Sequence, residues 1–305
     1  MIKVKNLVKN YGDFEAVKSI DFSIDHGEVV GFLGANGAGK STTLKILTGY
    51  LTPTSGSVLI NNLNIETDAH EIKKMIGYLP ESNPLYHDMF VYDLLKFTAS
   101  TRGIYNNDFK QAFDKVIVQC GLKEVIHKKV GECSKGYKQR VGLACAMIHD
   151  PKILILDEPV TGLDPNQIIE IRQLIKNLGK EKLVLMSSHI LQEIEATVDR
   201  IIIIDHGNIV ADGTTKKLMN QFMGNIKLTL EVIGFTDTKI EKFKELFHKA
   251  KIKKMKDSHK IVIEYKKKDD PRLDIFNFMV KNKLSLLEMN PQTANLEDIF
   301  RKLTN

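Results

Sequence analysis

Short apolar runs bounded by polar residues recur along the first part of the chain and predict buried strands. The runs are 27–34 (GEVVGFLG), 152–159 (KILILDEP), 182–189 (KLVLMSSH) and 200–207 (RIIIIDHG). Between them lie segments such as 41–51 and 165–180, in which apolar residues recur every three to four positions, and this spacing predicts helices. Strands that alternate with helices and are apolar on both faces indicate a mostly parallel sheet covered on both sides. The sequence therefore predicts an α/β fold.

The hydrophobic pattern changes twice along the chain. From about residue 84 to 150 the strand pattern vanishes, and helical spacing predicts a helical insertion between two strands of the sheet. The runs at 226–234 and 259–265 alternate like half-exposed strands, and 237–250, 270–283 and 295–304 have the spacing of amphipathic helices. We therefore expect a first domain of residues 1–215 and a small α+β domain of residues 221–305. The ferredoxin-like split arrangement is a candidate for the second domain.

Charge is distributed unevenly between these two parts. The 305 residues are 43% hydrophobic and 27% charged, which is typical of a soluble globular protein. Residues 221–305 hold 18 Lys and Arg against 12 Asp and Glu, which accounts for the whole net charge of +6. Residues 1–220 are balanced, so they present no basic field for nucleic acid. We interpret the basic tail as a solvated surface rather than a patch for nucleic acid or lipid headgroups.

The cysteines and apolar runs bear on the compartment. Cys120, Cys133 and Cys145 form no CxxC pair, and an odd number of cysteines does not make a disulfide framework. The first residues lack the apolar segment of a signal peptide, and no run approaches the roughly 18 apolar residues that span a bilayer. We expect a reduced cytosolic protein that depends on another chain for any membrane-spanning part.

A phosphate-binding motif lies between the first predicted strand and the first predicted helix. The stretch GANGAGKS fits G-x-x-x-x-G-K-[ST], and its position between a strand and a helix is the context that this motif requires. Its glycines let backbone N–H groups surround phosphates, and the helix N-terminus adds a positive dipole end. Lys40 would reach the β- and γ-phosphates, and Ser41 would bind Mg²⁺. The predicted phosphate-binding residues are Gly34, Asn36, Gly37, Gly39, Lys40, Ser41 and Thr42. A plain glycine-rich turn does not explain the Lys and Ser in register.

Two acids end the apolar run ILILDEP. A parallel strand would carry Asp157 to the carboxyl edge of the sheet, beside the phosphate-binding loop, where it can hold Mg²⁺ through water. Glu158 would then face the γ-phosphate, where a water molecule must be deprotonated or oriented for attack. Alone, the pair could be two solvated acids at a strand end, but the phosphate-binding loop favours the functional interpretation.

The stretch CSKGYKQRVGLACAM resembles the signature segment of ATP-binding-cassette (ABC) ATPases. Ser134 and Gly136 match the Ser and second Gly of the family consensus LSGGQ, whereas Cys133, Lys135 and Tyr137 depart from it. The resemblance implies that two cassettes pack head to tail and that the signature of each covers the nucleotide of the other. A signature that begins a helix would direct N–H groups and the helix dipole at the γ-phosphate.

Four further positions match the family in order. Tyr11 stands where the family stacks an aromatic ring on adenine, and Asp164 in TGLDP matches the loop that contacts the partner cassette. His189 lies 32 residues after Asp157, where the family has a histidine that bonds the γ-phosphate. Glu81 replaces the usual glutamine. It can accept a hydrogen bond from a Mg²⁺-bound water, but it cannot donate one as glutamine does. The alternative without a functional role is an ordinary loop tyrosine for Tyr11 and a structural histidine for His189.

The resemblance therefore implies a set of roles. The implied catalytic residues are Glu158, His189 and Glu81. The implied nucleotide-binding residues are Tyr11, Ser134, Gly136 and Asp164, together with the phosphate-binding loop. The implied metal-binding residues are Ser41, Asp157 and Glu81, and the implied cofactors are ATP and Mg²⁺. The implied fold is a P-loop NTPase of the ABC type, with a mostly parallel core sheet, an antiparallel β subdomain and a helical insertion.

Within the family, residues 2–215 resemble the ATPase subunits of exporters with a separate permease, and YLPESNPLY and SKGYKQRVGLA resemble the gliding-motility type. This implies a homodimer, or a heterodimer with a similar cassette, bound to an integral-membrane permease at the cytoplasmic, inner face of the membrane, with no nucleic acid expected. The alternative is a soluble ABC ATPase that acts on ribosomes or nucleic acid, but the chain has one cassette and no sustained heptads. A GTPase is disfavoured because NKLS (282–285) lacks the Asp of the guanine motif.

Overall fold

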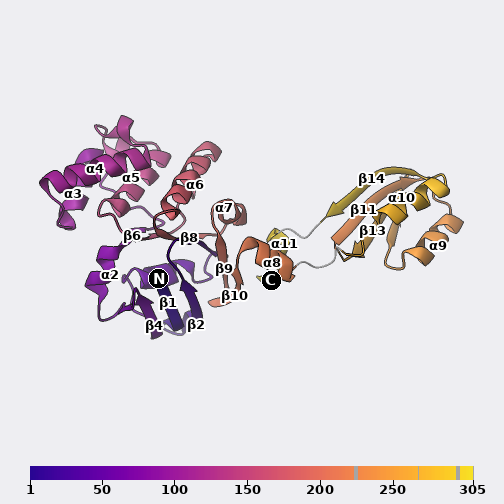
Figure 1. Cartoon of the computed structure of the whole chain (residues 1–305), viewed down its shortest axis with the longest axis horizontal. Coiled ribbons are helices and arrows are strands. Elements are labelled where there is room, and N and C mark those ends of the chain that lie inside the picture. Colours follow the sequence, from indigo (N-terminus) through magenta and orange to yellow (C-terminus); the bar gives the residue numbers. More distant parts are fainter. Residues whose placement is uncertain (223–225, 267, 293–295, 305) are drawn as a thin grey trace. The chain divides into compact units, whose positions relative to one another are not determined.

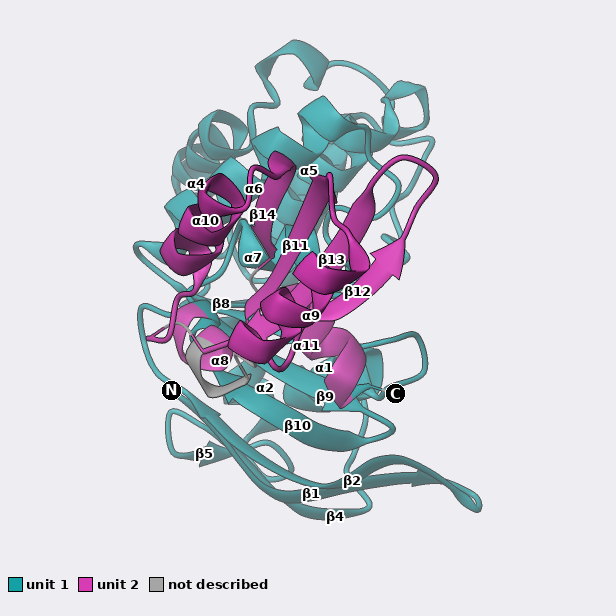
Figure 2. Ribbon diagram, turned by 90° about the vertical axis from the view of Figure 1, so that its right-hand side faces the viewer, with its two compact units in different colours: residues 1–215, 304 teal, residues 216–303, 305 magenta. Residues whose placement is uncertain are grey.

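The computed structural model describes residues 1–222, 226–266, 268–292 and 296–304 (Figure 1). The chain divides into two compact units, coloured separately in Figure 2: residues 1–215 with Thr304, and residues 216–303. Each unit has a buried hydrophobic cluster of its own.

A six-stranded sheet forms the centre of the first unit. Its strands are β3 (Val29–Leu33), β6 (Ile76–Leu79), β7 (Ile153–Leu156), β8 (Leu183–Ser188), β9 (Arg200–Asp205) and β10 (Asn208–Gly213). Their order is β10-β9-β3-β8-β7-β6, and every neighbouring pair is parallel except β10 with β9. Every residue of β3, β7 and β8 is buried, as expected for strands covered on both faces. Because these strands are parallel, their carboxyl ends meet at one edge, where an α/β sheet binds ligands.

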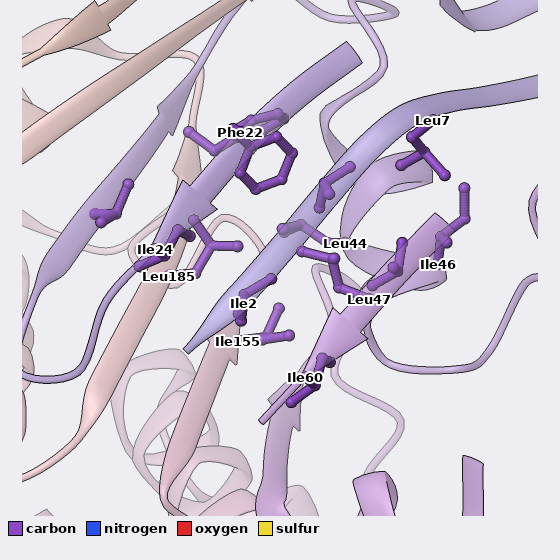
Figure 3. Close-up of a cluster of buried hydrophobic side chains, with 14 of the residues drawn as sticks. Ile2, Leu7, Phe22, Ile24, Leu44, Ile46, Leu47, Ile60, Ile155 and Leu185 are labelled. Carbon is purple, nitrogen blue, oxygen red and sulfur yellow. The ribbon is translucent and has the colours of Figure 1, made fainter. Parts of the chain in front are cut away.

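An antiparallel sheet and a helix complete the core. The sheet is ordered β2-β1-β4-β5, from β1 (Ile2–Tyr11), β2 (Phe14–Ile24), β4 (Ser55–Ile60) and β5 (Leu63–Asn64). Helix α1 (Lys40–Leu47) contributes Leu44, which is fully buried among side chains from both sheets, such as Ile2 and Leu185 (Figure 3). This packing fixes the start of α1 against the sheet edge.

Helices occupy the long connection between β6 and β7. They are α3 (Val91–Thr101), α4 (Asn106–Cys120) and α5 (Lys135–Met147), with short 3-10 turns at Lys123–Val125 and Val130–Glu132. Figure 1 shows α3, α4 and α5 gathered together, as the helical spacing predicts. The other helices of the unit are α2 (Ala69–Met75), α6 (Pro165–Gly179) and α7 (Leu191–Glu195).

The second unit is an α+β structure. Its elements are α8 (Thr215–Phe222), β11 (Ile226–Ile233), α9 (Asp237–Leu246), β12 (Lys251–Lys254), β13 (His259–Tyr265), α10 (Arg272–Lys281), β14 (Ser285–Gln292) and α11 (Leu296–Leu303). The sheet is antiparallel with the order β12-β13-β11-β14, and from β11 to β14 the chain runs β-α-β-β-α-β, which is the split arrangement. The hydrophobic patterns at 226–234 and 259–265 predict β11 and β13. The sequence pattern does not predict β12 or β14. Asn295, at the start of the last predicted helix, lies outside the described residues.

Two further properties concern the helices and the cysteines. Within the described ranges, no helix is long and apolar enough to cross a membrane. Cys120, Cys133 and Cys145 are free thiols, and burial raises the pKa of Cys120 to about 12 and that of Cys145 to about 11.

Candidate functional site

The loop between β3 and α1 has the backbone of a phosphate-binding loop. Gly37 and Gly39 have φ angles of 81° and 107°, which a residue with a side chain rarely adopts. A Cβ atom on Gly39 would also lie 2.6 Å from the Ala16 carbonyl oxygen. Among the described residues, no side chain caps the N-terminus of α1, so its first N–H groups can donate to an anion.

Lys40 begins α1, and its side chain reaches back to this loop with only 5% of the residue's surface exposed. Its Nζ donates hydrogen bonds to the carbonyl oxygens of Gly34 at 2.9 Å and Ala35 at 3.2 Å. The same Nζ lies 3.6 Å from Oε1 of Glu158, which is equally buried. A buried cation requires anionic or polar partners, so this ammonium has the environment of a phosphate-binding group.

Asp157 follows β7 directly and connects the loop to the neighbouring strand. Its Oδ1 accepts hydrogen bonds from Ser187 Oγ at 2.6 Å and from Ser41 Oγ at 3.2 Å. Ser187 Oγ in turn accepts a hydrogen bond from the backbone N–H of Glu158 at 2.9 Å. Sequence reasoning missed Ser187, although its place on a predicted strand two residues before His189 was an available signal.

The oxygen atoms of Ser41 and Asp157 fit a magnesium ion. Both are hard oxygen donors, and Mg²⁺ commonly takes one or two protein oxygens and completes its shell with water and substrate phosphates. The described residues include no group of three His, Cys, Asp or Glu that could hold a metal by itself. The remaining ligands would therefore come from a nucleotide and water.

Glu158 is held in an uncommon conformation. Its φ angle is 51°, in the left-handed region, so its backbone is strained. Its Oε2 accepts a hydrogen bond from Thr161 Oγ1 at 3.0 Å and lies 2.9 Å from Nδ1 of His189. Lys40, Thr161 and His189 thus fix the carboxylate from three sides, in a position suited to orient or deprotonate a water molecule.

A hollow of about 310 Å³ adjoins these groups. It is lined by Tyr11, Phe14, Ala16, Asn36, Gly37, Gly39, Lys40, Ser41, Thr42, Glu81 and Glu158. Tyr11 and Phe14 are exposed aromatic rings at the two sides of the β1–β2 turn. Exposed rings of this kind can stack on a planar base. Phe14 was missed from the sequence, where a second aromatic three residues after Tyr11 was the signal.

Three of the predicted site residues lie elsewhere in the chain. Ser134, Gly136 and Asp164 line a separate hollow of about 430 Å³ between α5 and α6. Ser134 caps α5 by accepting a hydrogen bond from the N–H of Tyr137 at 3.3 Å. Asp164 caps α6 in the same way, from the N–H of Gln167 at 2.9 Å. The structure therefore divides the predicted site into two separate groups of residues.

Comparison with known proteins gives the family. Residues 17–161 match the ABC transporter domain family. The uncharacterized ABC transporter ATP-binding protein YxlF of Bacillus subtilis is 33% identical over the full length of both chains. The bacitracin transport ATP-binding protein BcrA of Bacillus licheniformis is 41% identical over 70% of this chain and 69% of its own. These relatives do not favour the alternative of a soluble ABC ATPase on ribosomes or nucleic acid.

Solved structures confirm the predicted fold class. The dimeric, post-hydrolysis structure of the ATP-binding cassette MJ0796 with ADP and Pi is 26% identical, with a TM-score of 0.64. It covers 70% of this chain and 98% of its own. The full-length match to YxlF carries the relationship through both units of the chain. The chain therefore belongs to the ABC transporter ATP-binding proteins and is an ATPase subunit of an ABC transporter.

Proposed function

We propose that this subunit hydrolyses Mg²⁺-bound ATP in the hollow beside Lys40 and drives export through a separate permease. One observation supports the site assignment most strongly. The Lys40 ammonium, the Asp157 carboxylate and the Glu158 carboxylate meet at the carboxyl edge of the sheet, within one network of hydrogen bonds and ion pairs. A phosphate-binding cation, a metal-binding acid and a base are the groups that phosphoryl transfer to water requires.

The residues of the loop would bind the nucleotide. Lys40 would exchange part of its bonding to backbone carbonyls for the β- and γ-phosphates, and Tyr11 would stack on the adenine. The backbone of Gly34, Asn36, Gly37, Gly39 and Thr42 would surround the phosphates. Ser41, Asp157 and Glu81 would hold Mg²⁺ directly or through water. When bound, the metal neutralises charge on the phosphates.

Glu158 and His189 would carry out the hydrolytic step. Glu158 would orient the attacking water and accept its proton, because its Oε2 and Oε1 are already fixed by neighbouring groups. His189 would donate to the γ-phosphate through Nε2–H. Because the Glu158 carboxylate beside its Nδ1 can only accept, both ring nitrogens would then have to carry a proton. Glu81, which lines the same hollow, would accept from a metal-bound water.

A second cassette would complete each site. Ser134, Gly136 and Asp164 lie outside the hollow beside Lys40, so within one chain they line different cavities. We propose that they act on the nucleotide of a partner, in a homodimer or in a heterodimer with a similar cassette. The N-terminus of α5 at this surface would direct N–H groups at the partner's γ-phosphate, and Asp164 would contact the partner cassette.

The membrane part of the transporter would be another chain. Among the described helices, none can cross a bilayer, and the relatives include the bacitracin transport protein BcrA. We propose that the subunit is cytoplasmic and peripheral on the inner face of the membrane. Residues 1–215 would form the cassette, with a helical subdomain at about 84–150, and residues 221–305 would form an accessory domain.

Affinity capture from detergent-solubilised membranes of the source organism tests the export proposal. The bait would be a tagged Glu158→Gln variant loaded with ATP, and the captured proteins would be identified by mass spectrometry. The matched control is Lys40→Ala, which should not hold ATP. Recovery of a multi-spanning membrane protein with the first bait supports the proposal. Recovery of ribosomal proteins or nucleic-acid-binding proteins without a permease contradicts it.

A further inference from the structure

The N-termini of α5 and α6 come together although they belong to different parts of the unit. Helix α5 ends the helical insertion, whereas α6 follows the strand that carries Asp157. The hollow of about 430 Å³ is lined by residues of both helices, including Ser134 before α5 and Asp164 before α6. Both capping residues therefore border one cavity.

Arg140 joins three helices at this point. Its Nη2 forms an ion pair with Oε2 of Glu170 on α6, and its Nη1 donates a hydrogen bond of 3.1 Å to the carbonyl oxygen of Cys120, the last residue of α4. The Arg140 side chain is 17% exposed and that of Glu170 is 59% exposed. The planar guanidinium can hold both partners at once, which a lysine ammonium on the same stem would do less well.

Two glycines allow the helix ends to approach each other closely. A Cβ atom on Gly136 of α5 would lie 2.5 Å from Cδ of Gln167 on α6. A Cβ atom on Gly162, in the loop before α6, would overlap the Lys135 ammonium, which lies over this glycine. The Lys135 side chain therefore contacts the loop before α6. The contact between the two segments is thus continuous from Lys135 to Arg140.

We propose that Arg140, through its ion pair with Glu170, is a positioning residue that fixes the Ser134 segment relative to the Asp164 segment. This inference rests on the proposed dimer, in which both segments must contact the same partner cassette. If the two segments moved independently, each would have to be ordered when the dimer closes, and that ordering opposes association. The ion pair fixes their relative position beforehand.

The expected effect is modest for each chain and larger for the dimer. A partly exposed ion pair changes an equilibrium constant by about threefold. A homodimer contains two such pairs in distant positions, so their effects should combine to about tenfold in the dimer dissociation constant. The binding of ATP to the isolated chain should not change, because Arg140 and Glu170 do not line the hollow beside Lys40.

Sedimentation velocity with ATP and Mg²⁺ measures the dimer dissociation constant in the Glu158→Gln background. The test variants are Arg140→Gln, Glu170→Gln and the charge swap Arg140→Glu with Glu170→Arg. Glu170→Gln keeps the Arg140 bond to Cys120, so it tests the ion pair even if Arg140→Gln folds poorly. The matched control is Lys115→Gln, which removes a different exposed ion pair, to Asp150, outside this cavity. Fluorescence titration gives ATP affinity in each case.

The proposal expects both single variants to dimerise about tenfold more weakly, with unchanged ATP affinity, and the charge swap to recover at least part of the loss. Lys115→Gln should match the background. Dimer affinity equal to the background in Arg140→Gln and Glu170→Gln overturns the inference and leaves the dimer proposal intact. Absence of an ATP-dependent dimer in the background itself overturns both.

Discussion

The Oε2 atom of Glu158 lies 2.9 Å from Nδ1 of His189, although 31 residues separate the two positions. The contact forms because β7 and β8 are adjacent and parallel, so the residues that follow them meet at one edge. Since Lys40 holds the other carboxylate oxygen at 3.6 Å, the acid cannot turn away from the phosphate-binding loop without breaking both contacts.

Glu158→Gln should slow ATP hydrolysis by about 10²–10⁴-fold, the usual contribution of a general base. Glutamine has the same shape but cannot take a proton at neutral pH, so ATP binding should persist and an ATP-bound dimer should accumulate. Phosphate release under single-turnover conditions, together with size-exclusion chromatography, measures both effects. The control is Glu181→Gln, an exposed acid outside the site. Near-normal turnover in Glu158→Gln would remove this residue from the assigned role.

Ser187→Ala should weaken both the fold and the metal site. Ser187 is fully buried, and its loss leaves the Glu158 N–H without its partner, which costs about 1–3 kcal/mol of unfolding free energy. It also removes the shorter of the two hydrogen bonds to Asp157 Oδ1, so the Mg²⁺ concentration needed for half-maximal hydrolysis should rise several-fold. Urea denaturation and a Mg²⁺ titration of ATPase activity measure the two effects.

The neighbouring Ser188 supplies the matched control for that experiment. Its buried hydroxyl donates to Glu193 at 2.7 Å and accepts from the N–H of Ile190, away from the metal site. Ser188→Ala should therefore reduce stability to a similar extent and leave the Mg²⁺ requirement unchanged. If both variants shift the Mg²⁺ requirement equally, Ser187 has no specific part in the metal site.

The sequence predicts the central strands well because burial on both faces requires a continuous apolar run, such as ILIL in β7, directly before Asp157. It does not predict β12, whose KIKK pattern reads as a polar segment and whose pairing with β13 depends on tertiary contacts. Ser187 is missed for a similar reason. Its hydrogen bonds cross from β8 to the residues after β7, so they depend on which strands are neighbours, and the spacing to His189 alone does not show that pairing.

Glu81→Gln should change ATP affinity in a metal-dependent way. Glu81 lines the hollow beside Lys40, and its charge should repel metal-free ATP, which carries about four negative charges. Removing one charge a few ångströms from the phosphates should change the free energy of ATP binding by up to about 1 kcal/mol. The variant should therefore bind ATP several-fold more tightly in excess EDTA. With saturating Mg²⁺ the difference should vanish or reverse, because Glu81 then has a cation to interact with. Fluorescence titrations with and without EDTA measure both values.

The same charge change at a distant acid provides the control. Glu66→Gln alters an exposed residue outside the hollow and should leave ATP affinity unchanged in both buffers. Equal ATP affinity of Glu81→Gln and the parent protein in EDTA would place the Glu81 carboxylate too far from the phosphates for a role at the metal.

His149 should make the stability of the first unit depend on pH. The ring's Nε2 lies 3.0 Å from the carbonyl oxygen of Ile76, the first residue of β6, and its Nδ1 has no hydrogen-bond partner among the described residues. Burial, helped by the Arg102 and Lys182 cations and opposed by Asp150 and the Ile76 carbonyl, lowers the pKa of His149 from its ordinary value of 6.5 to about 4. The folded chain therefore resists a proton that the unfolded chain accepts.

The lowered pKa of His149 fixes the direction in which the free energy of unfolding changes with pH. Above pH 6.5 neither state is protonated at His149, and stability is complete. As the pH falls from 6.5 towards 4, only the unfolded state binds the proton, so the free energy of unfolding decreases. With a discount for the solvent-exposed part of the ring, the loss should reach about 1 kcal/mol at pH 5. His149→Gln should show less of this decrease, whereas the exposed His127→Gln should follow the parent protein. Urea denaturation at pH 7.5, 6 and 5 measures the three slopes, and identical slopes for all three proteins would contradict the lowered pKa of His149.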